Sequence, residues 1–369
     1  MTQEIARNDE LTVFLLGALQ IHPRVSWTDL ATVLGVNATT LSRRWQILQD
    51  EGLAWVTCMP ADDDDWFYLA PHGATAYVEV SCRPGARNSV ITQIASDREA
   101  WSIECTSGTR DLLLSVTAAT TRALDDYTTN VLGSIDGIES VRTNPVRRFL
   151  ASPSGWRISG LRAGQRSTLM AMAKLAERPL RHHEPTELER RVMAELSIDG
   201  RATATEISRA TGFSVSAVNG AVGRIASAPW AQFRVDFAQE QLGWDVMASL
   251  WITAPQSQVP EIGNMLRRFP AEVREAVSMI GGANLYVHIW AKDFDTLDSI
   301  EEMITGSFPL VRLADRWITT RFAKRAGAVL GPDGRRESYV AMLPPLEPSR
   351  VGAGAPALSL ATSSMKDSL

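Results

Sequence analysis

An internal repeat limits what this chain can fold into more than any other feature of its sequence. When residues 11–48 are laid over residues 188–225 without a gap, side chains of the same kind recur. Such self-similarity means that one structural unit occurs twice in the chain. The matched pairs are Leu11/Leu188, Leu15/Val192, Leu19/Leu196, Arg24/Arg201, Leu30/Ile207, Gly35/Gly212, Leu41/Val218 and Leu48/Ile225.

The repeated unit begins with three short helices. Residues 9–20 place apolar side chains on one helical stripe, and Ser26 opens a capping box that starts a second helix, which ends at Gly35. Asn37 is a good N-cap for a third helix over residues 36–50. Three short helices with a tight glycine turn before the third indicate a helix-turn-helix motif.

Two strand-like segments follow the third helix. Residues 53–58 and 66–70 predict a hairpin beside that helix, in the manner of a wing. Four aspartates at residues 62–65 join the two strands. Because these carboxylates would repel phosphate, we do not expect the tip of the wing to enter a DNA groove.

The periodicity changes after the wing. Residues 76–150 read as strand, helix, two strands, helix and strand, which is the ferredoxin-like arrangement of an antiparallel sheet with helices on one side. In the second half the correspondence is weaker but continues, with residues 76–84 over 247–255 and 108–111 over 281–284. The predicted fold class is therefore α+β: a winged helix-turn-helix plus a ferredoxin-like βαββαβ domain, the pair occurring twice in one chain.

Six segments follow from this plan. They are an N-terminal winged helix-turn-helix (1–70), a first ferredoxin-like domain (71–150), a basic linker (151–184), a second helix-turn-helix (185–245), a second ferredoxin-like domain (246–326) and a C-terminal tail (327–369) that we expect to be largely disordered after about residue 344. Residues 140–185 contain nine basic residues and two acidic ones, although the whole chain has a net charge of −5. That concentration is either an electrostatic track for phosphate or a solvated basic linker.

The third helix has two different faces. Leu41, Trp45 and Leu48 fall on one side at helical spacing. The other side carries hydroxyls, an amide and guanidiniums, which reach base edges and phosphates in a major groove. This pattern predicts double-stranded DNA as a partner; the alternative is a capped surface helix with two solvated arginines. The predicted DNA-binding residues are Thr39, Thr40, Ser42, Arg43, Arg44 and Gln46.

The second copy of this helix lacks the same groups. The positions of Arg43, Arg44 and Gln46 carry Gly220, Ala221 and Gly223. Each glycine in a helix interior costs about 1 kcal/mol relative to alanine, and the phosphate partners are gone. Only Arg224 remains nearby. We therefore expect the second helix-turn-helix to be a structural partner with weak or absent DNA contact.

A helix-turn-helix followed by a βαββαβ domain resembles the Lrp/AsnC family of bacterial and archaeal transcription regulators. The resemblance covers residues 9–150 and 186–326 and implies a small "RAM" effector domain that binds amino acids, pairs through its sheet and forms dimers or larger homo-oligomers. The duplication adds the hypothesis that the two effector domains of one chain pair with each other. The residues that carry the resemblance are 29–31, 34–36, 40–48, Gly52 and 108–114.

A Gly-x-x-Asp loop is the effector site that the resemblance implies. Here it would consist of Gly108, Thr109, Arg110 and Asp111. A glycine loop exposes backbone N–H groups that can hold a carboxylate, and an aspartate accepts a hydrogen bond from an ammonium group. The alternative is a tight hairpin in which Gly108 supplies a positive φ and Asp111 caps the turn. In the second copy Asn284 replaces the aspartate, which puts a second ligand site in doubt.

An enzyme is the rival class. Siroheme decarboxylases resemble the same family and use histidine, tyrosine and arginine near the sheet. The equivalent strands here, residues 101–106 and 276–280, carry no histidine, His288 reads as a core residue, and Arg110 is the one candidate cation of the first copy. A third class is a ligand sensor that acts through protein partners without DNA. We predict a regulator rather than an enzyme.

Other sequence features are consistent with a cytoplasmic protein. The chain starts with no basic segment followed by an apolar core, and it has no run of about 18 apolar residues. We therefore expect no membrane partner. Three cysteines and five scattered histidines form neither a disulfide set nor a metal-ligand pattern, so we predict no metal and no cofactor.

Overall fold

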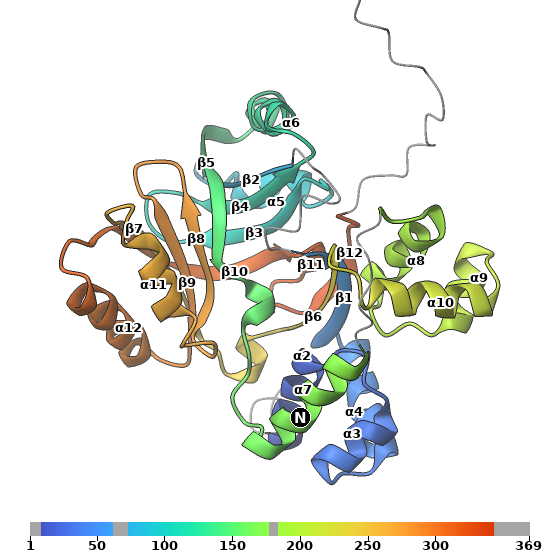
Figure 1. The fold of residues 1–369 in the computed structure, drawn as a ribbon. Helices are drawn as coiled ribbons and strands as arrows, with labels where there is room; N and C mark the ends of the chain where they lie inside the picture. The colour runs from blue at the N-terminus through green and yellow to red at the C-terminus, as the bar shows by residue number, and fades with distance from the viewer. Residues whose placement is uncertain (1–8, 62–72, 177–183, 343–369) are drawn as a thin grey trace, which may run out of the picture.

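The structure is a computed structural model that describes residues 9–61, 73–176 and 184–342. Two helical heads lie beside a larger β-structure that carries further helices on its outside (Figure 1). The mixed class of helices and strands predicted from the sequence is confirmed. Among the described residues no helix is long and apolar enough to cross a membrane.

The first head consists of the three predicted helices, α2 (Glu10–Ile21), α3 (Trp27–Leu34) and α4 (Ala38–Asp50). The N–H of Asp29 donates to Ser26 Oγ at 3.0 Å, which caps α3, and Gly35 ends it with φ +71°. Apolar side chains from all three helices form the core of this head. They include Leu15, Leu19, Leu30, Leu41, Trp45 and Leu48.

The second head repeats the arrangement with α8 (Glu187–Ile198), α9 (Ala204–Thr211) and α10 (Val215–Ile225). Both α8 and α9 begin with complete capping boxes, so their first turns are well satisfied. The two heads thus have the same order of helices, and each has its own apolar cluster.

A pair of strands joins the heads. β1 (Ala54–Pro60) runs antiparallel to β6 (Ala231–Phe237), with Ala54 opposite Phe237 and Pro60 opposite Ala231. The sequence predicted a wing made by residues 53–58 and 66–70. Residues 66–70 lie outside the described residues, so the wing stays a prediction, whereas the described partner of β1 comes from the other half of the chain.

Two segments with the same order of elements form the β-structure. Within the first the strand order is β3-β4-β2-β5, and within the second it is β10-β7-β9-β8. The first consists of β2 (Ala74–Cys82), α5 (Arg87–Ile94), β3 (Ala100–Thr106), β4 (Leu112–Ala118), α6 (Thr121–Asp126) and β5 (Ile138–Ala151). The second consists of β7 (Val246–Thr253), α11 (Val259–Leu266), β8 (Val273–Met279), β9 (Leu285–Ala291), α12 (Phe294–Ser307) and β10 (Arg312–Arg325).

The two sheets close on each other. β5 pairs with β8, and the long strand β10 pairs with β7 in its first half and with β3 in its second. These eight strands form a continuous ring, so the two βαββαβ segments pair with each other within one chain. Because side chains alternate along a strand, Val78 packs under the outer helices while Tyr77 points to the interior between the sheets.

The segment between the halves is not a free linker. Trp156, Ile158 and Leu161 are buried in the apolar cluster that joins the core of the first head to residues of the second half, and α7 (Ala163–Ala176) packs against α2 and α3. The predicted tail also begins with structure. A hairpin of β11 (Ala328–Leu330) and β12 (Arg336–Tyr339) lies against the first head, where the N–H of Arg336 donates to the carbonyl of Gly52 at 2.9 Å. Residues from 343 on lie outside the described residues.

Candidate functional sites: a recognition helix and an arginine-lined cavity

The predicted recognition helix α4 is anchored on one side and open on the other. Asn37 Oδ1 accepts from the N–H of Thr39 at 2.8 Å and so caps the helix. Trp45 is 3% exposed and holds the inner face. On the outer face Thr39, Thr40, Arg43 and Gln46 are exposed, and Ser42 is half-buried, with its hydroxyl donating to the carbonyl of Thr39.

The two arginines of this helix have different surroundings. Arg44 Nη1 lies 2.8 Å from Asp9 Oδ2, so this guanidinium ties α4 to the start of α2. Arg43 is exposed and has no ion pair within the described residues. Gln46 donates to Asp50 Oδ1 at 2.7 Å, a contact on the open surface. Arg43 is therefore the strongest candidate for a DNA contact on this face.

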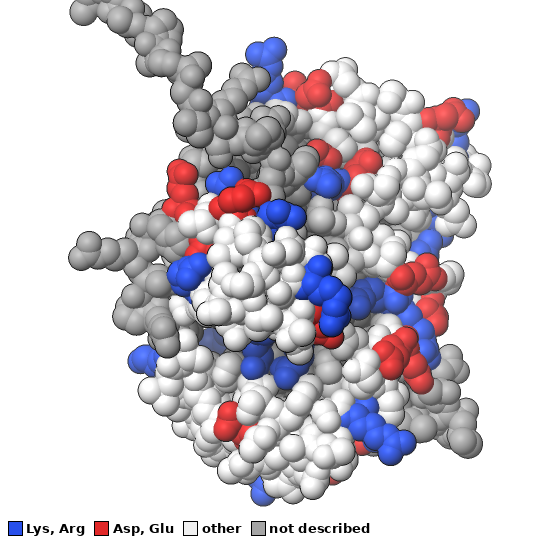
Figure 2. All heavy atoms as spheres, turned by 90° about the vertical axis from the view of Figure 1, so that its right-hand side faces the viewer, with Lys and Arg blue, Asp and Glu red and all other residues white. Residues whose placement is uncertain are grey.

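The corresponding helix of the second head offers no such cation. Gly220 and Gly223 lie on α10, and Ala221 is buried. Arg224 Nε lies 2.6 Å from Glu189 Oε1, so the remaining guanidinium is paired within its own head. Figure 2 shows acidic and basic side chains intermingled over the face of the molecule that it presents, with no broad field of one sign.

The Gly108–Asp111 loop is a closed hairpin between β3 and β4. Gly108 has φ +91°, and Asp111 Oδ2 accepts from the N–H of Cys82 at 2.7 Å. Thr109 is exposed. The positive φ at Gly108 is the feature that the hairpin alternative predicts, whereas the Asp111 carboxylate holds the end of β2 instead of capping its own turn.

Arg110 points away from solvent into the space between the sheets. Its Nε lies 2.9 Å from Glu79 Oε2 and its Nη2 lies 2.6 Å from Asp315 Oδ2. The guanidinium lies 3.9 Å from the ring centroid of Trp317. Arg110 therefore links the first effector segment to β10 of the second instead of facing an external ligand.

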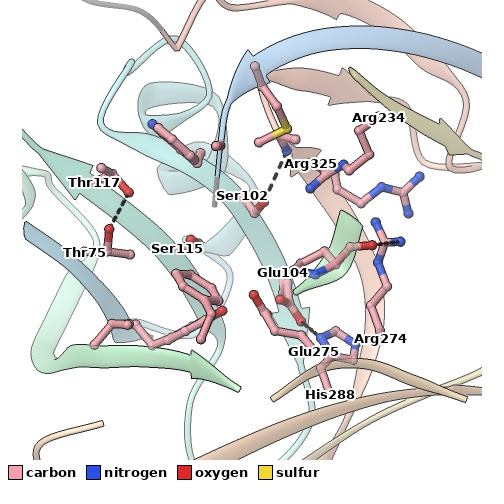
Figure 3. A pocket seen from close by; sticks show the side chains of 18 of the residues that line it. Thr75, Ser102, Glu104, Ser115, Thr117, Arg234, Arg274, Glu275, His288 and Arg325 are labelled. Carbon is pink, nitrogen blue, oxygen red and sulfur yellow. Dashed lines mark hydrogen bonds and ion pairs between the residues drawn. The ribbon is translucent and has the colours of Figure 1, made fainter. Parts of the chain in front are cut away.

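A cavity of about 150 Å³ lies between the sheets and the strand β6 (Figure 3). Its residues come from both halves of the chain, and sequence analysis did not find it. One wall carries the hydroxyls of Thr75, Ser102, Ser115 and Thr117 from β2, β3 and β4. The opposite wall carries guanidiniums from three strands. They belong to Arg234 on β6, Arg274 on β8 and Arg325 on β10.

The three guanidiniums share one buried carboxylate, Asp236. The distances from Asp236 are 2.7 Å to Arg234 Nε, 2.8 Å to Arg274 Nη2 and 3.6 Å to Arg325 Nε. Burial alone would raise the pKa of Asp236, but the guanidiniums hold this pKa below its ordinary value. Burial lowers the pKa of Arg274 to about 9 and that of Arg325 to about 10.

Glu104 and His288 meet on the same wall. Glu104 accepts from Thr319 Oγ1 at 2.7 Å, and burial raises its pKa to about 8. His288 Nδ1 lies 3.7 Å from Glu104 Oε2 and 3.2 Å from the hydroxyl of Tyr286, while Trp290 Nε1 donates to His288 Nε2 at 3.3 Å. Burial and then Arg274 lower the pKa of His288 to about 3, so the ring is neutral. His288 is thus buried and hydrogen-bonded, as a core residue would be, yet it lines the cavity.

Comparison with known proteins shows which family this chain resembles. Residues 75–152 match the family model described as the Lrp/AsnC ligand binding domain. This segment is similar to the ligand binding domain of the Lrp/AsnC family. HTH-type transcriptional regulator PF1231 of Pyrococcus furiosus is 26% identical over 148 residues, which cover 40% of this chain and 95% of that protein. HTH-type transcriptional regulator FL11 of Pyrococcus horikoshii is 25% identical over 124 residues, or 33% of this chain and 81% of that protein.

One solved structure extends over most of the chain. The siroheme decarboxylase NirDL superposes with a TM-score of 0.54 and 12% identity, covering 86% of this chain and 93% of its own. NirDL has also been solved in complex with an iron-uroporphyrin III analogue. At this level of identity the likeness shows a shared fold alone. No group of three or more metal-ligating side chains occurs among the described parts of our chain.

Proposed function

We propose that this chain is a sequence-specific DNA-binding transcriptional regulator of the Lrp/AsnC type. The observation that carries the proposal is the exposed outer face of α4, where Arg43 projects from a helix whose inner face is anchored by Trp45. In helix-turn-helix proteins the second helix of the motif enters the major groove. The names of the two Pyrococcus relatives support the same function. Such a regulator acts in the cytoplasm, where the chromosome lies.

In this proposal each chain has one helix-turn-helix that binds DNA, the first head. In the second helix-turn-helix, α10 has Gly220 and Gly223 and a paired Arg224, so this helix offers no unpaired cation for phosphate. The two effector segments already pair within the chain, which makes one polypeptide comparable to a dimer of single-unit relatives. Two half-sites of a palindromic operator would then need two chains, and we propose a homo-oligomer for this reason.

A small molecule regulates the assembly in this proposal. An effector at the Gly108–Asp111 loop would meet the exposed Thr109, whereas Arg110 and Asp111 already have intramolecular partners. The cavity between the sheets is better formed, since charged side chains from several strands converge there. An amino acid or related metabolite remains the proposed class of effector for the family-type loop.

The DNA proposal is tested by genome-wide recovery of bound DNA with the wild type and with Arg43→Ala. The matched control is Arg122→Ala, an exposed arginine on α6 that removes the same charge. We expect one specific motif with the wild type and the control, and its loss with Arg43→Ala. A base contact by Arg43 would be worth about 1–3 kcal/mol.

The salt dependence of DNA binding distinguishes a base contact by Arg43 from a phosphate contact. If Arg43 binds phosphate, the slope of log affinity against log salt falls by about 1 in Arg43→Ala, uniformly across sequences. Failure of the wild type to enrich any motif, together with unchanged binding in Arg43→Ala, would refute the proposal.

A tetrapyrrole-modifying enzyme is the second candidate. The specific observation in its favour is that His288, Tyr77 and five arginines line one cavity, in a chain that superposes on most of NirDL. The sequence argument against an enzyme was the lack of histidine on two strands, and it did not foresee that β9 brings His288 to the cavity. A volume of about 150 Å³ is, however, below the roughly 300–1,000 Å³ usual for drug-sized ligands.

Absorbance distinguishes the candidates. Mixing the full chain with iron-uroporphyrin III should leave the pigment spectrum unchanged if the chain is only a regulator. A shifted Soret band, followed by release of carbon dioxide from the pigment's carboxylates, would replace the first proposal with the second. Retained DNA recovery in the same preparation would show that both activities coexist.

A further inference from the structure

We propose that the cavity between the sheets binds a small polycarboxylate through Arg234, Arg274 and Arg325 at its inner end and Arg148 at its mouth. This class of ligand differs from the zwitterionic amino acid expected at the Gly108–Asp111 loop. The inference rests on the proposed function only for the ligand's role as an effector, because the binding itself follows from the cavity.

Three guanidiniums converge at the inner end of the cavity. The three guanidiniums are each at most 8% exposed, and Asp236 lies between them. Glu275 is the next carboxylate on the wall, and Glu104, with a pKa near 8, is protonated at neutral pH. Asp236 is shared by all three guanidiniums, and Arg325 also lies in the field of the more distant Glu104 and Glu240. A buried charge needs a partner, and a carboxylate ligand supplies one.

One of the guanidiniums is also incompletely hydrogen-bonded. Arg325 donates from Nη1 to Gln239 Oε1 at 2.5 Å and from Nη2 to the carbonyl of Phe237, but its Nε has no hydrogen-bond partner among the described residues. Arg325 is 3% exposed and lines the cavity. Buried polar groups of this kind are nearly always satisfied, and this donor lies 3.6 Å from Asp236 Oδ1, which leaves it available to a closer acceptor such as a ligand or an ordered water molecule.

The rest of the lining indicates more than one carboxylate. Arg147 and Arg148 lie on β5, are exposed and line the same cavity. They form a second group of cations, on a different strand from the buried three. Thr75, Ser102, Ser115 and Thr117 also line the cavity and add neutral hydroxyls that can donate to ligand oxygens. An anion with two or three carboxylates matches the two groups of cations.

Carboxylates of this kind have two sources, a free small acid or the periphery of a tetrapyrrole. We commit to the small acid because a cavity of about 150 Å³ holds a molecule near the size of benzene, and succinate is only slightly larger, whereas a tetrapyrrole is several times that size. The two sources are separate arms of the experiment.

The experiment uses calorimetric titration of the full chain with citrate, succinate and uncharged succinamide, at constant ionic strength. A further arm uses iron-uroporphyrin III. We expect citrate or succinate to bind and succinamide not to bind. Arg148→Gln should weaken the binding about three- to fivefold, as expected for one exposed ion pair. Arg142→Gln, an exposed arginine of the same strand that does not line the cavity, should change it less than twofold.

Arg325→Gln tests the inner end. It should abolish measurable binding, and circular dichroism checks that the variant is folded. If it does not fold, Arg148→Gln with its control still decides the question. Absence of binding by all three charged probes, or equal losses in Arg148→Gln and Arg142→Gln, would overturn the proposal. Binding of the porphyrin alone, sensitive to Arg148→Gln, would overturn the commitment to a small acid. DNA recovery by the wild type is measured separately, so its failure would affect only the effector role.

Discussion

Arg24 and Arg201 occupy equivalent positions in the two heads, and each binds the backbone of the other head. Arg24 donates to the carbonyls of Gly200 and Ala202, and Arg201 donates to those of Pro23, at 2.5 Å, and Val25, at 2.9 Å. This exchange makes the contact between the heads nearly two-fold symmetric within one chain. Burial lowers the pKa of both guanidiniums, that of Arg201 to about 10, so both are charged at neutral pH.

Removal of Arg201 should loosen the paired heads. In Arg201→Ala the carbonyls of Pro23 and Val25 lose their donor, and the guanidinium stacked 4.0 Å from the ring centroid of Trp27 disappears. Charge-assisted hydrogen bonds of this kind are worth about 1.5–3 kcal/mol, so we expect the free energy of unfolding to fall by about 2–3 kcal/mol. Urea denaturation measures it. Arg209→Ala, an exposed arginine of α9, is the control and should change stability by less than about 0.5 kcal/mol. Equal urea midpoints for Arg201→Ala and Arg209→Ala would contradict a role of Arg201 in holding the two heads together.

The carboxylate of Asp236 should be essential for stability. Asp236→Asn keeps the shape but leaves three buried guanidiniums without their shared anion. Loss of one partner from a buried pair costs about 3–5 kcal/mol, and we expect a loss in this range by chemical denaturation. Asp125→Asn, an exposed aspartate of α6, should be neutral. Partial recovery of the Asp236→Asn variant in citrate would link stability to the anion site, whereas wild-type stability of this variant without ligand would show that the cluster needs no internal anion.

Stability should fall with rising pH between about 6.5 and 8. The pKa of Glu104 is about 8 in the folded chain and 4.5 without perturbation, so its contribution is complete below 4.5 and lost as pH rises through 8. His288 acts in the opposite direction, because its pKa is lowered from 6.5 to about 3, and its contribution is complete above 6.5. The interval above 6.5 therefore reports on Glu104. We expect a slope of up to roughly 1.4 kcal/mol per pH unit there, and a flatter curve for Glu104→Gln. If the stability of the wild type and that of Glu104→Gln depend on pH in the same way, Glu104 is not the source of this pH dependence.

The glycines of α10 should be replaceable. No heavy atom lies within 4 Å of the place where a Cβ of Gly223 would sit, apart from its own helix and chain neighbours. Gly223→Ala should therefore stabilise the chain by about 0.5–1 kcal/mol through helix propensity. Gly212→Ala is the matched contrast. That position also has free space, but its φ of +80° penalises a side chain by about 1–2 kcal/mol. Thermal melts should move in opposite directions, and destabilisation by Gly223→Ala would mean that the second recognition helix needs its glycines.

Local structure followed closely from local sequence. The caps at Ser26 and Asn37 and the stop at Gly35 predicted the helices of the first head, because capping and periodicity depend on neighbours a few positions away. The repeat predicted a second head with the same order of helices. The outer face of α4 was predicted residue by residue, and the structure leaves Arg43 exposed on it while pairing Arg44 with Asp9.

Only the tertiary structure decided what the interior would contain. β1 pairs with β6, and β10 leaves its own sheet to pair with β3, so strands far apart in the chain become neighbours. Arg234, Arg274 and Arg325 meet around Asp236 for that reason, and no spacing in the sequence indicates it. A repeat predicts which elements form and in what order. The final position of a charged side chain depends on which sheet edges pair with each other. That pairing is determined by packing across the whole molecule.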